Sequence, residues 1–520
     1  MERLNAAPNS AVSDGHRRKT RRGRLSRHNA PLETPIFHRR RVPAYNFLNE
    51  RALARIEDQA DWILNEIGVE FRGDRHALDF FAQAGARIKG ERVRFEPGQV
   101  REICATAPEE FNLHGRDPNN TVTLGGDNLV LMPGYGSPFV SDLFRGRRYA
   151  TLEDFHNFVK LAYVSPILHL SGGTVIEPTD VPVNKRHLDM MQAHLTLSTK
   201  PFMGSVTAPE RALDSIEMAK LIFGCDFMKH NAVMQANINV NSPLVYDHTM
   251  SSALRVYAEA NQCVCVSPAI FAGAMGPLSP AAVAAQTLAE AMVGIALTQL
   301  VRPGCPVVFG SFHSTMNLRS GALTFGSPEA GMTTMALSQL GRRLGVPVRS
   351  GGGQITASNA PDGQAMQDSA DAMWATLLSG THQVWHAAGW LEGGLVMSYE
   401  KFIMDLDHCG AMLKLLQGFD TDDEAFGRDA YVETGPGENF LSTNHTLRHY
   451  TTANFEPQIS DAGPYENWVE NGALTSDQRA STRWRQMLED YQQPEMNSGI
   501  RSTLEEYISE RKAAMPDEWH

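Results

Sequence analysis

The stretch LGVPVRSGGGQ, residues 344–354, joins a short apolar run to three consecutive glycines. The apolar run is typical of a buried strand, and a segment of helical length precedes it. Glycines directly behind a strand allow the backbone to bend sharply or to approach a ligand closely. The stretch therefore predicts a strand whose carboxyl end opens into a functional loop.

Seven further apolar runs have the same character, and helix-length segments lie between most of them. The repeat of roughly 30–45 residues is typical of successive βα units, and strands that alternate with helices indicate a parallel sheet. Eight such units close most naturally into a (β/α)8 TIM barrel, with an open doubly wound sheet as the alternative. The strand candidates are LVLMPGYG (129–136), ILHLSGGTV (167–175), PFMGSVT (201–207), AVMQANINVN (232–241), CVCVSPAIFAG (263–273), PVVFGSF (306–312), PVRSGGG (347–353) and QVWHAAGW (383–390).

Many of these runs end in small or polar residues, such as GYGS at 134–137, NINVN at 237–241 and HAAGW at 386–390. A barrel places its active site at the carboxyl ends of its strands. We therefore expect the site where these segments meet.

Three further parts flank the predicted barrel, which spans residues 121–417. Residues 1–43 form a basic tail, residues 44–120 a mainly helical segment, and residues 418–520 a C-terminal cap. The tail has seven Lys and Arg residues within positions 16–27, but it lacks the apolar region of an export signal. A nucleic-acid arm is one interpretation, and a disordered, solvated extension is the favoured one.

The composition is that of a folded soluble protein, with 42% hydrophobic and 20% charged residues. The formal net charge of −12 argues against general nucleic-acid binding, which normally shows as a basic surplus. Six cysteines in 520 residues do not make a disulfide framework. No run approaches the roughly 18 apolar residues that span a bilayer. We expect a cytoplasmic protein that binds neither nucleic acid nor membrane.

The glycine stretch is not a phosphate-binding loop. GGGQ lacks the Gly-Lys-Ser/Thr ending of a P-loop, and both GYGSPF (134–139) and GPGENF (435–440) lack the third glycine of a dinucleotide fingerprint. No GxSxG elbow supports a nucleophilic serine. Cys263 and Cys265 would face the same side of a strand. With a histidine they could bind zinc, although two small buried residues are the favoured interpretation.

Aromatic and polar residues gather in QVWHAAGWLEGGLVMSYE, residues 383–400. Aromatic faces around a pocket bind quaternary ammonium groups, worth about 0.5–2 kcal/mol, whereas packing between helices and sheet is the alternative role for each tryptophan. Glu329 stands at a predicted helix start, where it would either stabilise the helix or contact a ligand. The candidates for the pocket are Tyr135, Trp374, Trp385, His386, Trp390 and Glu392.

Several segments, in chain order, match one known family: PVVFGSF with FGSPE, VPVRSGGGQ with APDGQA, AAGWLEGGLVMS and GENFLSTNHT. Together they resemble the trimethylamine methyltransferase family of corrinoid-dependent enzymes, from about Pro43 to the C-terminal region. No single motif is highly specific, but the ordered set is. The resemblance implies a (β/α)8 barrel that transfers a methyl group from an amine to the cobalt of a corrinoid (cobalamin) carried by a separate protein.

The founding archaeal members of that family carry pyrrolysine in the loop where this sequence has SGGGQ. The pyrrolysine position falls at Gly353 or, with a different gap, at Gly352. The chain thus resembles the branch without pyrrolysine, whose characterised members demethylate quaternary amines such as glycine betaine. The resemblance does not decide between glycine betaine, proline betaine, carnitine, γ-butyrobetaine and choline.

This resemblance also implies roles for the candidate residues. A quaternary amine leaves as a neutral tertiary amine, so that no acid and no metal is required and positioning the methyl group is the main task. The aromatic cage would consist of Tyr135, Trp374, Trp385 and Trp390, and His386 and Glu392 would contact substrate or corrinoid. Glu329 would be a carboxylate in the site or directly behind it, and Glu329 and His386 are the catalytic candidates. The glycine loop would leave space for substrate or corrinoid. We expect an oligomer. The alternatives are a non-catalytic betaine-binding or sensing barrel, and a zinc-dependent corrinoid methyltransferase that uses Cys263 and Cys265.

Overall fold

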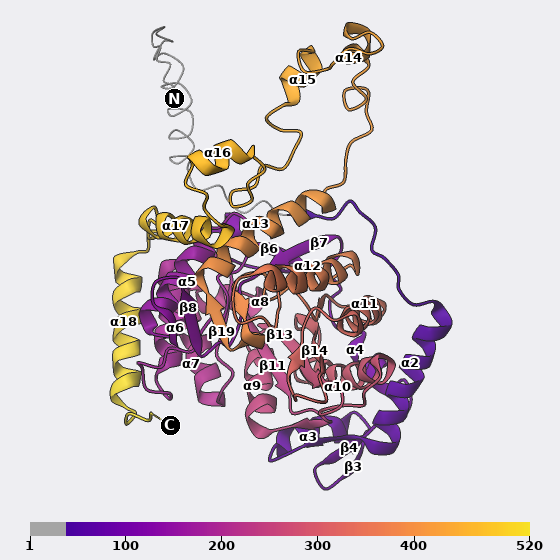
Figure 1. Cartoon of the computed structure of the whole chain (residues 1–520). Coiled ribbons are helices and arrows are strands. Elements are labelled where there is room, and N and C mark those ends of the chain that lie inside the picture. The colour runs from indigo at the N-terminus through magenta and orange to yellow at the C-terminus, as the bar shows by residue number, and fades with distance from the viewer. Residues whose placement is uncertain (1–37, 520) are drawn as a thin grey trace, which may run out of the picture.

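A curled sheet forms the centre of the computed structural model, which describes residues 38–519 (Figure 1). The predicted basic tail lies, up to residue 37, outside that range. The parallel strands run in the order β10 (Phe202–Met203), β11 (Met234–Val240), β13 (Cys263–Phe271), β14 (Val307–Met316) and β16 (Val348–Ser350), and β15 (Leu323–Thr324) pairs antiparallel with β14.

Helices follow these strands in the predicted alternation: α9 (His248–Glu259) comes after β11, α10 (Pro280–Val301) after β13, α11 (Pro328–Arg343) after β14 and α12 (Gly363–Leu378) after β16. The residue before each of the first three, Asp247, Ser279 or Ser327, accepts a hydrogen bond from an N–H group of the first turn. Such caps satisfy backbone donors that have no partner inside the helix. Local sequence therefore fixes where these helices begin.

Two more strands, β7 (Asn128–Leu131) and β17 (Gln383–Val384), pair in parallel with each other. His382 N donates to Val348 O at 3.0 Å, which links β17 to β16. The prediction of a strand over residues 167–175 is wrong. Only an isolated bridge, between Gly172 and Phe202, forms there. The φ of +108° at Gly172 interrupts the extended backbone. The other seven predicted strands are present, and the result is a mixed α/β fold with a curled half-barrel sheet.

Alternate residues of β13 face different cores. Val264 and Val266 belong to the cluster that contains the outer helices, whereas Cys263 and Cys265 belong to an inner cluster with Trp385. The two cysteines share one face, as the sequence predicted, because side chains alternate along a strand. That inner face leads to the candidate site.

The helix α10 corrects the expectation that no segment of the chain approaches the apolar length of a membrane span. It is 22 residues long with a mean hydropathy of 1.5 in its most apolar window, enough by length and composition to cross a membrane. However, 89% of that window is buried inside the protein. The helix packs against the sheet on one side and against α2 (Glu50–Trp62) and α4 (Gln99–Cys104) on the other. Its apolar surface is therefore that of a helix enclosed by the core.

The N-terminal segment contains strands as well as helices, unlike the mainly helical prediction. Within the stretch RHALDFFAQAGARI, residues 75–88, the helix α3 (Arg75–Gln83) ends at Gln83, since Gly85 has a φ of +83° that ordinary helix residues do not adopt. The remainder forms a hairpin of β3 (Arg87–Lys89) and β4 (Arg92–Arg94), joined to β2 (Val69–Phe71).

The C-terminal part combines packed helices with a projecting arm. Trp484 of α17 (Ser476–Glu489) donates to Glu400 of α13 (Tyr399–Leu416) at 3.1 Å, and Asp214 holds α18 (Ser498–Ala513) through Tyr507 and Arg511. Residues 420–450, here called the arm, contain α14 (Arg428–Glu433) and α15 (Asn444–His449). Figure 1 shows the arm extending beyond the body of the protein, with α16 (Tyr465–Glu470) nearer its base.

Candidate active site

Six side chains from different strand ends form one continuous group, here called the strand-end cluster. The indole of Trp385 lies between the ring of Tyr135, at 6.0 Å between centroids, and the guanidinium of Arg349, at 4.4 Å. On the far side, the ring of Phe312 lies 5.6 Å from His386 and 5.8 Å from Trp390. The cluster consists of Tyr135, Phe312, Arg349, Trp385, His386 and Trp390.

Arg349 is a buried cation with only uncharged partners. Its exposed fraction is 2%. It donates to Ser267 Oγ at 3.3 Å, to the carbonyl of Ser311 and to His386 Nε2 at 3.1 Å. Burial lowers the pKa of Arg349 to about 10, which leaves it protonated at neutral pH. No carboxylate within residues 38–519 forms an ion pair with it. Since buried charges are normally paired, Arg349 is suited to an anionic ligand.

The imidazole of His386 is neutral, and its tautomer follows from its neighbour. Burial, together with the adjacent Arg349 charge, holds the pKa of His386 well below its usual range. Because Nε2 accepts from Arg349, the ring proton sits on Nδ1. Nδ1 is buried without a protein partner. His386 also has a φ of +55°, a strained conformation for a side-chain-bearing residue and a frequent one at functional sites.

Unpaired polar atoms are concentrated in and beside the cluster. Buried polar groups in proteins nearly always have hydrogen-bond partners. Here four N–H donors have none within the described residues, and the Asn237 oxygen beside Tyr135 is likewise unpaired. The donors are Arg349 Nε, Trp385 Nε1, His386 Nδ1 and Trp390 Nε1. Aromatic faces and unpaired N–H groups in one place can serve a ligand that carries both a cation and an anion.

The three glycines do not open space for a ligand, contrary to the expectation from the sequence. A Cβ on Gly353 would lie 2.2 Å from the carbonyl oxygen of Trp385, and one on Gly352 would lie 2.0 Å from Thr376 Oγ1. Gln354 N then donates to His386 O at 2.8 Å. The loop is therefore packed against the backbone that carries Trp385 and His386, and glycine is needed for that close approach.

A wholly buried ion pair lies behind this loop. Lys401 Nζ contacts Asp405, Ser369 Oγ at 2.9 Å and the carbonyl of Gln354 at 3.4 Å. The other oxygen of Asp405 accepts from Gly389 N at 2.8 Å. Burial raises the pKa of Asp405 to about 7 against the opposing effect of Lys401. The pair fixes the backbone on both sides of the cluster, at Gln354 and at Gly389.

Three predicted site residues lie apart from the cluster. Trp374 is 36% exposed on α12 and has no aromatic contact with the cluster in the described chain. Glu329 is exposed in the first turn of α11, the position that stabilises a helix dipole. Glu392 forms an ion pair with Arg147 at 3.0 Å. The structure brings together Tyr135, Trp385, His386 and Trp390 from the predicted set.

The sequence analysis missed Arg349 and Phe312. Arg349 is the charged residue inside the apolar run PVRS, so an arginine in a strand predicted to be buried was the available signal. Phe312 ends the run PVVFGSF and had no distinguishing feature in the sequence. Neither residue can be placed next to His386 without the pairing of β14 with β16.

The buried cysteines do not form a metal centre with other described residues. Burial raises the pKa of the Cys265 thiol to about 12 and that of Cys263 well above its usual value. Zinc requires deprotonated thiolates. In the part of the chain that the structure describes, no group of three potential metal ligands includes either cysteine. The two cysteines therefore have no third protein ligand beside them among the described residues.

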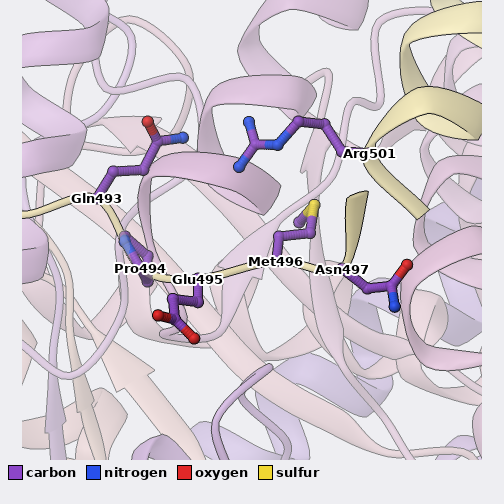
Figure 2. Close-up of a pocket in the computed structure, with 6 residues that line it drawn as sticks. All are labelled: Gln493, Pro494, Glu495, Met496, Asn497 and Arg501. Carbon is purple, nitrogen blue, oxygen red and sulfur yellow. The ribbon is translucent and has the colours of Figure 1, made fainter. Parts of the chain in front are cut away.

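An open pocket lies elsewhere, at the beginning of α18 (Figure 2). Its lining contains no aromatic ring and no strand end, and none of the predicted site residues is part of it. It is lined by Gln493, Pro494, Glu495, Met496, Asn497 and Arg501. The strand-end cluster, with its buried unpaired donors, is the better candidate for the active site.

Comparison with known proteins identifies the family of the chain. The family model described as trimethylamine methyltransferase matches residues 14–516. This chain belongs to that family. A glycine betaine methyltransferase from Desulfitobacterium hafniense is 41% identical over 478 residues, 92% of this chain and 99% of that protein.

Two further comparisons, one with a protein sequence and one with a solved structure, show more distant similarity. A proline betaine:corrinoid methyltransferase from Eubacterium limosum is 26% identical over 488 residues, 89% of this chain and 97% of that protein. The crystal structure of the monomethylamine methyltransferase of Methanosarcina barkeri aligns with a TM-score of 0.45 at 10% identity, covering 85% of this chain and 93% of that one.

Proposed function

We propose that this family member transfers a methyl group from a betaine to the cobalt of a corrinoid carried by a separate protein. A betaine combines a quaternary ammonium group with a carboxylate. The observation that carries the proposal is Arg349, a buried guanidinium without a carboxylate partner, set beside the aromatic rings of the strand-end cluster. The names of the relatives, glycine betaine methyltransferase and proline betaine:corrinoid methyltransferase, support the same substrate class.

The proposed roles follow from the chemistry of each group. Trp385, Trp390 and Phe312 offer aromatic faces to the ammonium group, worth about 0.5–2 kcal/mol for a desolvated cation. Arg349 pairs with the carboxylate, and a charge-assisted hydrogen bond of this kind is stronger than a neutral one. His386, through its unpaired Nδ1–H, donates a further hydrogen bond. These contacts would orient one methyl group.

The partner's corrinoid would supply a strongly nucleophilic cobalt that accepts the methyl group. The substrate leaves as a neutral tertiary amine, so no residue of this chain is needed to protonate it. The contribution of the chain is positioning, which can account for a large share of a rate enhancement. This agrees with a buried site whose histidine is neutral and whose glutamates lie elsewhere.

We also propose that the sheet closes into a (β/α)8 barrel with a C-terminal cap beginning near residue 418. The support is a set of backbone hydrogen bonds that continue around the ring. His169 N donates to Leu131 O at 2.8 Å and Met203 N to Gly172 O at 2.8 Å, in addition to the bond from His382 to Val348. A cytoplasmic location and assembly into an oligomer stay predictions, which fractionation and light scattering would test.

A substrate panel with free cob(I)alamin tests the proposed function. Glycine betaine, proline betaine and carnitine should yield the methylcobalamin spectrum. Choline and trimethylamine, which lack the carboxylate, should react at least about 100-fold more slowly. Equal rates with choline would contradict the role of Arg349. Calorimetric binding of betaines without any methyl transfer, even with a corrinoid protein present, would favour a binding or sensing protein.

A further inference from the structure

Away from the candidate active site, one glutamate and two histidines of the arm converge. Glu424 lies before α14, and His445 and His449 lie one turn apart on α15. The side-chain ligand atoms of all three lie within 4.8 Å of one another. His449 Nε2 is 2.8 Å from a carboxylate oxygen of Glu424, and the two imidazole centroids are 4.6 Å apart.

These side chains are suitable ligands for a divalent transition metal. Histidine nitrogens and a carboxylate oxygen bind zinc at about 2.0–2.2 Å in tetrahedral geometry, which places the ligand atoms about 3.3 Å from one another. The three side chains retain solvent exposure, so small rotations suffice to reach that spacing. A spacing of four residues places both histidines on the same face of a helix.

The backbone of the arm accommodates this arrangement. Gly427 has a φ of +56°, and a Cβ at that position would lie 3.2 Å from the His445 ring. A larger residue would be strained and would press on the imidazole. Glycine at 427 therefore allows the turn after Glu424 to pack against His445.

The charge around the three residues favours a cation. The segment DTDDEAFGRD contributes several carboxylates near Glu424. Arg448 currently pairs with Glu424 at 2.9 Å, but it also pairs with Asp429 at 2.8 Å. A metal ion at Glu424 would leave Arg448 with a carboxylate partner, so the arginine need not become unpaired.

The arm also has little apolar burial to hold it together. Ala430 is its one buried apolar side chain, whereas Val432 is 89% exposed and Leu441 80% exposed. Short segments without a core commonly depend on disulfides or metal ions. We propose that Glu424, His445 and His449 bind one divalent metal ion of the zinc type, which ties α15 to the turn before α14.

Zinc titration of the full chain, after treatment with a chelator, tests the proposal. Calorimetry should detect one site that is lost in His445→Ala and His449→Ala and weakened at least tenfold in Glu424→Gln. Because zinc also binds isolated surface groups, His230→Ala is the matched control: His230 is an exposed histidine outside the arm, and its removal should leave the site intact. Cobalt should give the visible absorption of a tetrahedral complex in the wild type and in His230→Ala, but not in His445→Ala or His449→Ala.

Limited trypsin digestion gives an independent readout. Zinc should slow cleavage after Arg428 and Arg448 in the wild type, and should have no effect on His449→Ala. Absence of zinc binding by the wild type would overturn the proposal. So would a site that survives in all three arm variants and is lost with His230→Ala.

Discussion

Arg349 and Lys401 are both buried cations, yet their surroundings differ. Lys401 lies behind the glycine loop, where Asp405 neutralises it and Ser369 and Gln354 accept its remaining hydrogen bonds. Arg349, in the strand-end cluster on the other side of the same loop, has only hydroxyl, carbonyl, imidazole and aromatic neighbours. Of the two cations, only Lys401 has a counter-ion among the described residues.

The difference separates a structural cation from a functional one. A satisfied buried pair holds its neighbours in one arrangement, whereas a buried charge without its counter-ion is normally expensive and is kept where a ligand completes it. Lys401 and Asp405 thus support the backbone at Gln354 and Gly389, and the strand-end cluster carries the side chains that we propose bind the substrate.

The largest expected effect is the loss of folding stability when Lys401 is replaced. Lys401→Met leaves Asp405 buried without a partner, which should lower the free energy of unfolding by about 3–5 kcal/mol. Urea denaturation followed by circular dichroism measures this. The double variant Lys401→Met/Asp405→Leu removes both charges and should regain most of the loss. If the single variant were as stable as the wild type, the pair would not have the structural role assigned to it.

Removing the arginine should instead affect activity. Arg349→Met should reduce methyl transfer from glycine betaine by about 100- to 1,000-fold, within the 2–5 kcal/mol typical of a lost charge-pair partner. Its free energy of unfolding should stay equal or rise, since no buried anion is left behind. Arg485→Met is the control, because Arg485 of α17 also lies over aromatic rings but is half-buried and outside the strand-end cluster. Unchanged kcat/KM in Arg349→Met would contradict the proposed carboxylate site.

Acidification should weaken the fold, because four buried histidines lose stability as the pH falls and only Asp405 opposes them. His194, His313 and His382 have pKa values lowered by burial to about 4 from the usual 6.5, and the pKa of His386 is also well below that value. The unfolded chain therefore binds protons first, so stability present above pH 6.5 is lost as the pH falls towards 4.

Asp405, whose pKa is raised to about 7 by burial, opposes this trend. Between pH 7 and its unfolded value near 4, the folded chain holds one extra proton, which offsets about one histidine. Four histidines less this one proton leave about three protons, so the net loss should be roughly 4 kcal/mol per pH unit around pH 5, at about 1.4 kcal/mol per proton. Urea titrations at pH 5 and pH 6 measure it, and equal midpoints would refute the neutral state of these histidines.

The smallest expected effect on activity comes from removing one unpaired hydrogen-bond donor, the indole N–H of Trp390. Trp390→Phe keeps an aromatic face beside His386 but removes the indole N–H, and should lower kcat/KM for betaines by about 10-fold. Trp374→Phe, on the exposed helix face, should have no effect. A larger loss in Trp374→Phe than in Trp390→Phe would place Trp374 in the site after all.

The contrast between the two cations also explains what the sequence could predict. The aromatic residues Trp385 and Trp390 follow a recognisable strand, so their place at a strand end was predictable from the local pattern. Lys401 and Asp405 are four residues apart, the spacing of an ordinary exposed helix pair, and only tertiary packing shows that both are buried. The 36% exposure of Trp374 was likewise not predictable, since the apolar period of α12 does not specify which face meets the sheet.

Gly353 has a consequence for how this chain can change over generations. Its Cβ direction points at the Trp385 carbonyl, and Gly352 is enclosed by Thr376. A codon change that introduces any side chain at either position would displace the backbone carrying Trp385 and His386. A change between glycine and a long residue in this loop, in either direction, therefore requires simultaneous changes in the neighbouring backbone. A single substitution would disturb the positions of Trp385 and His386.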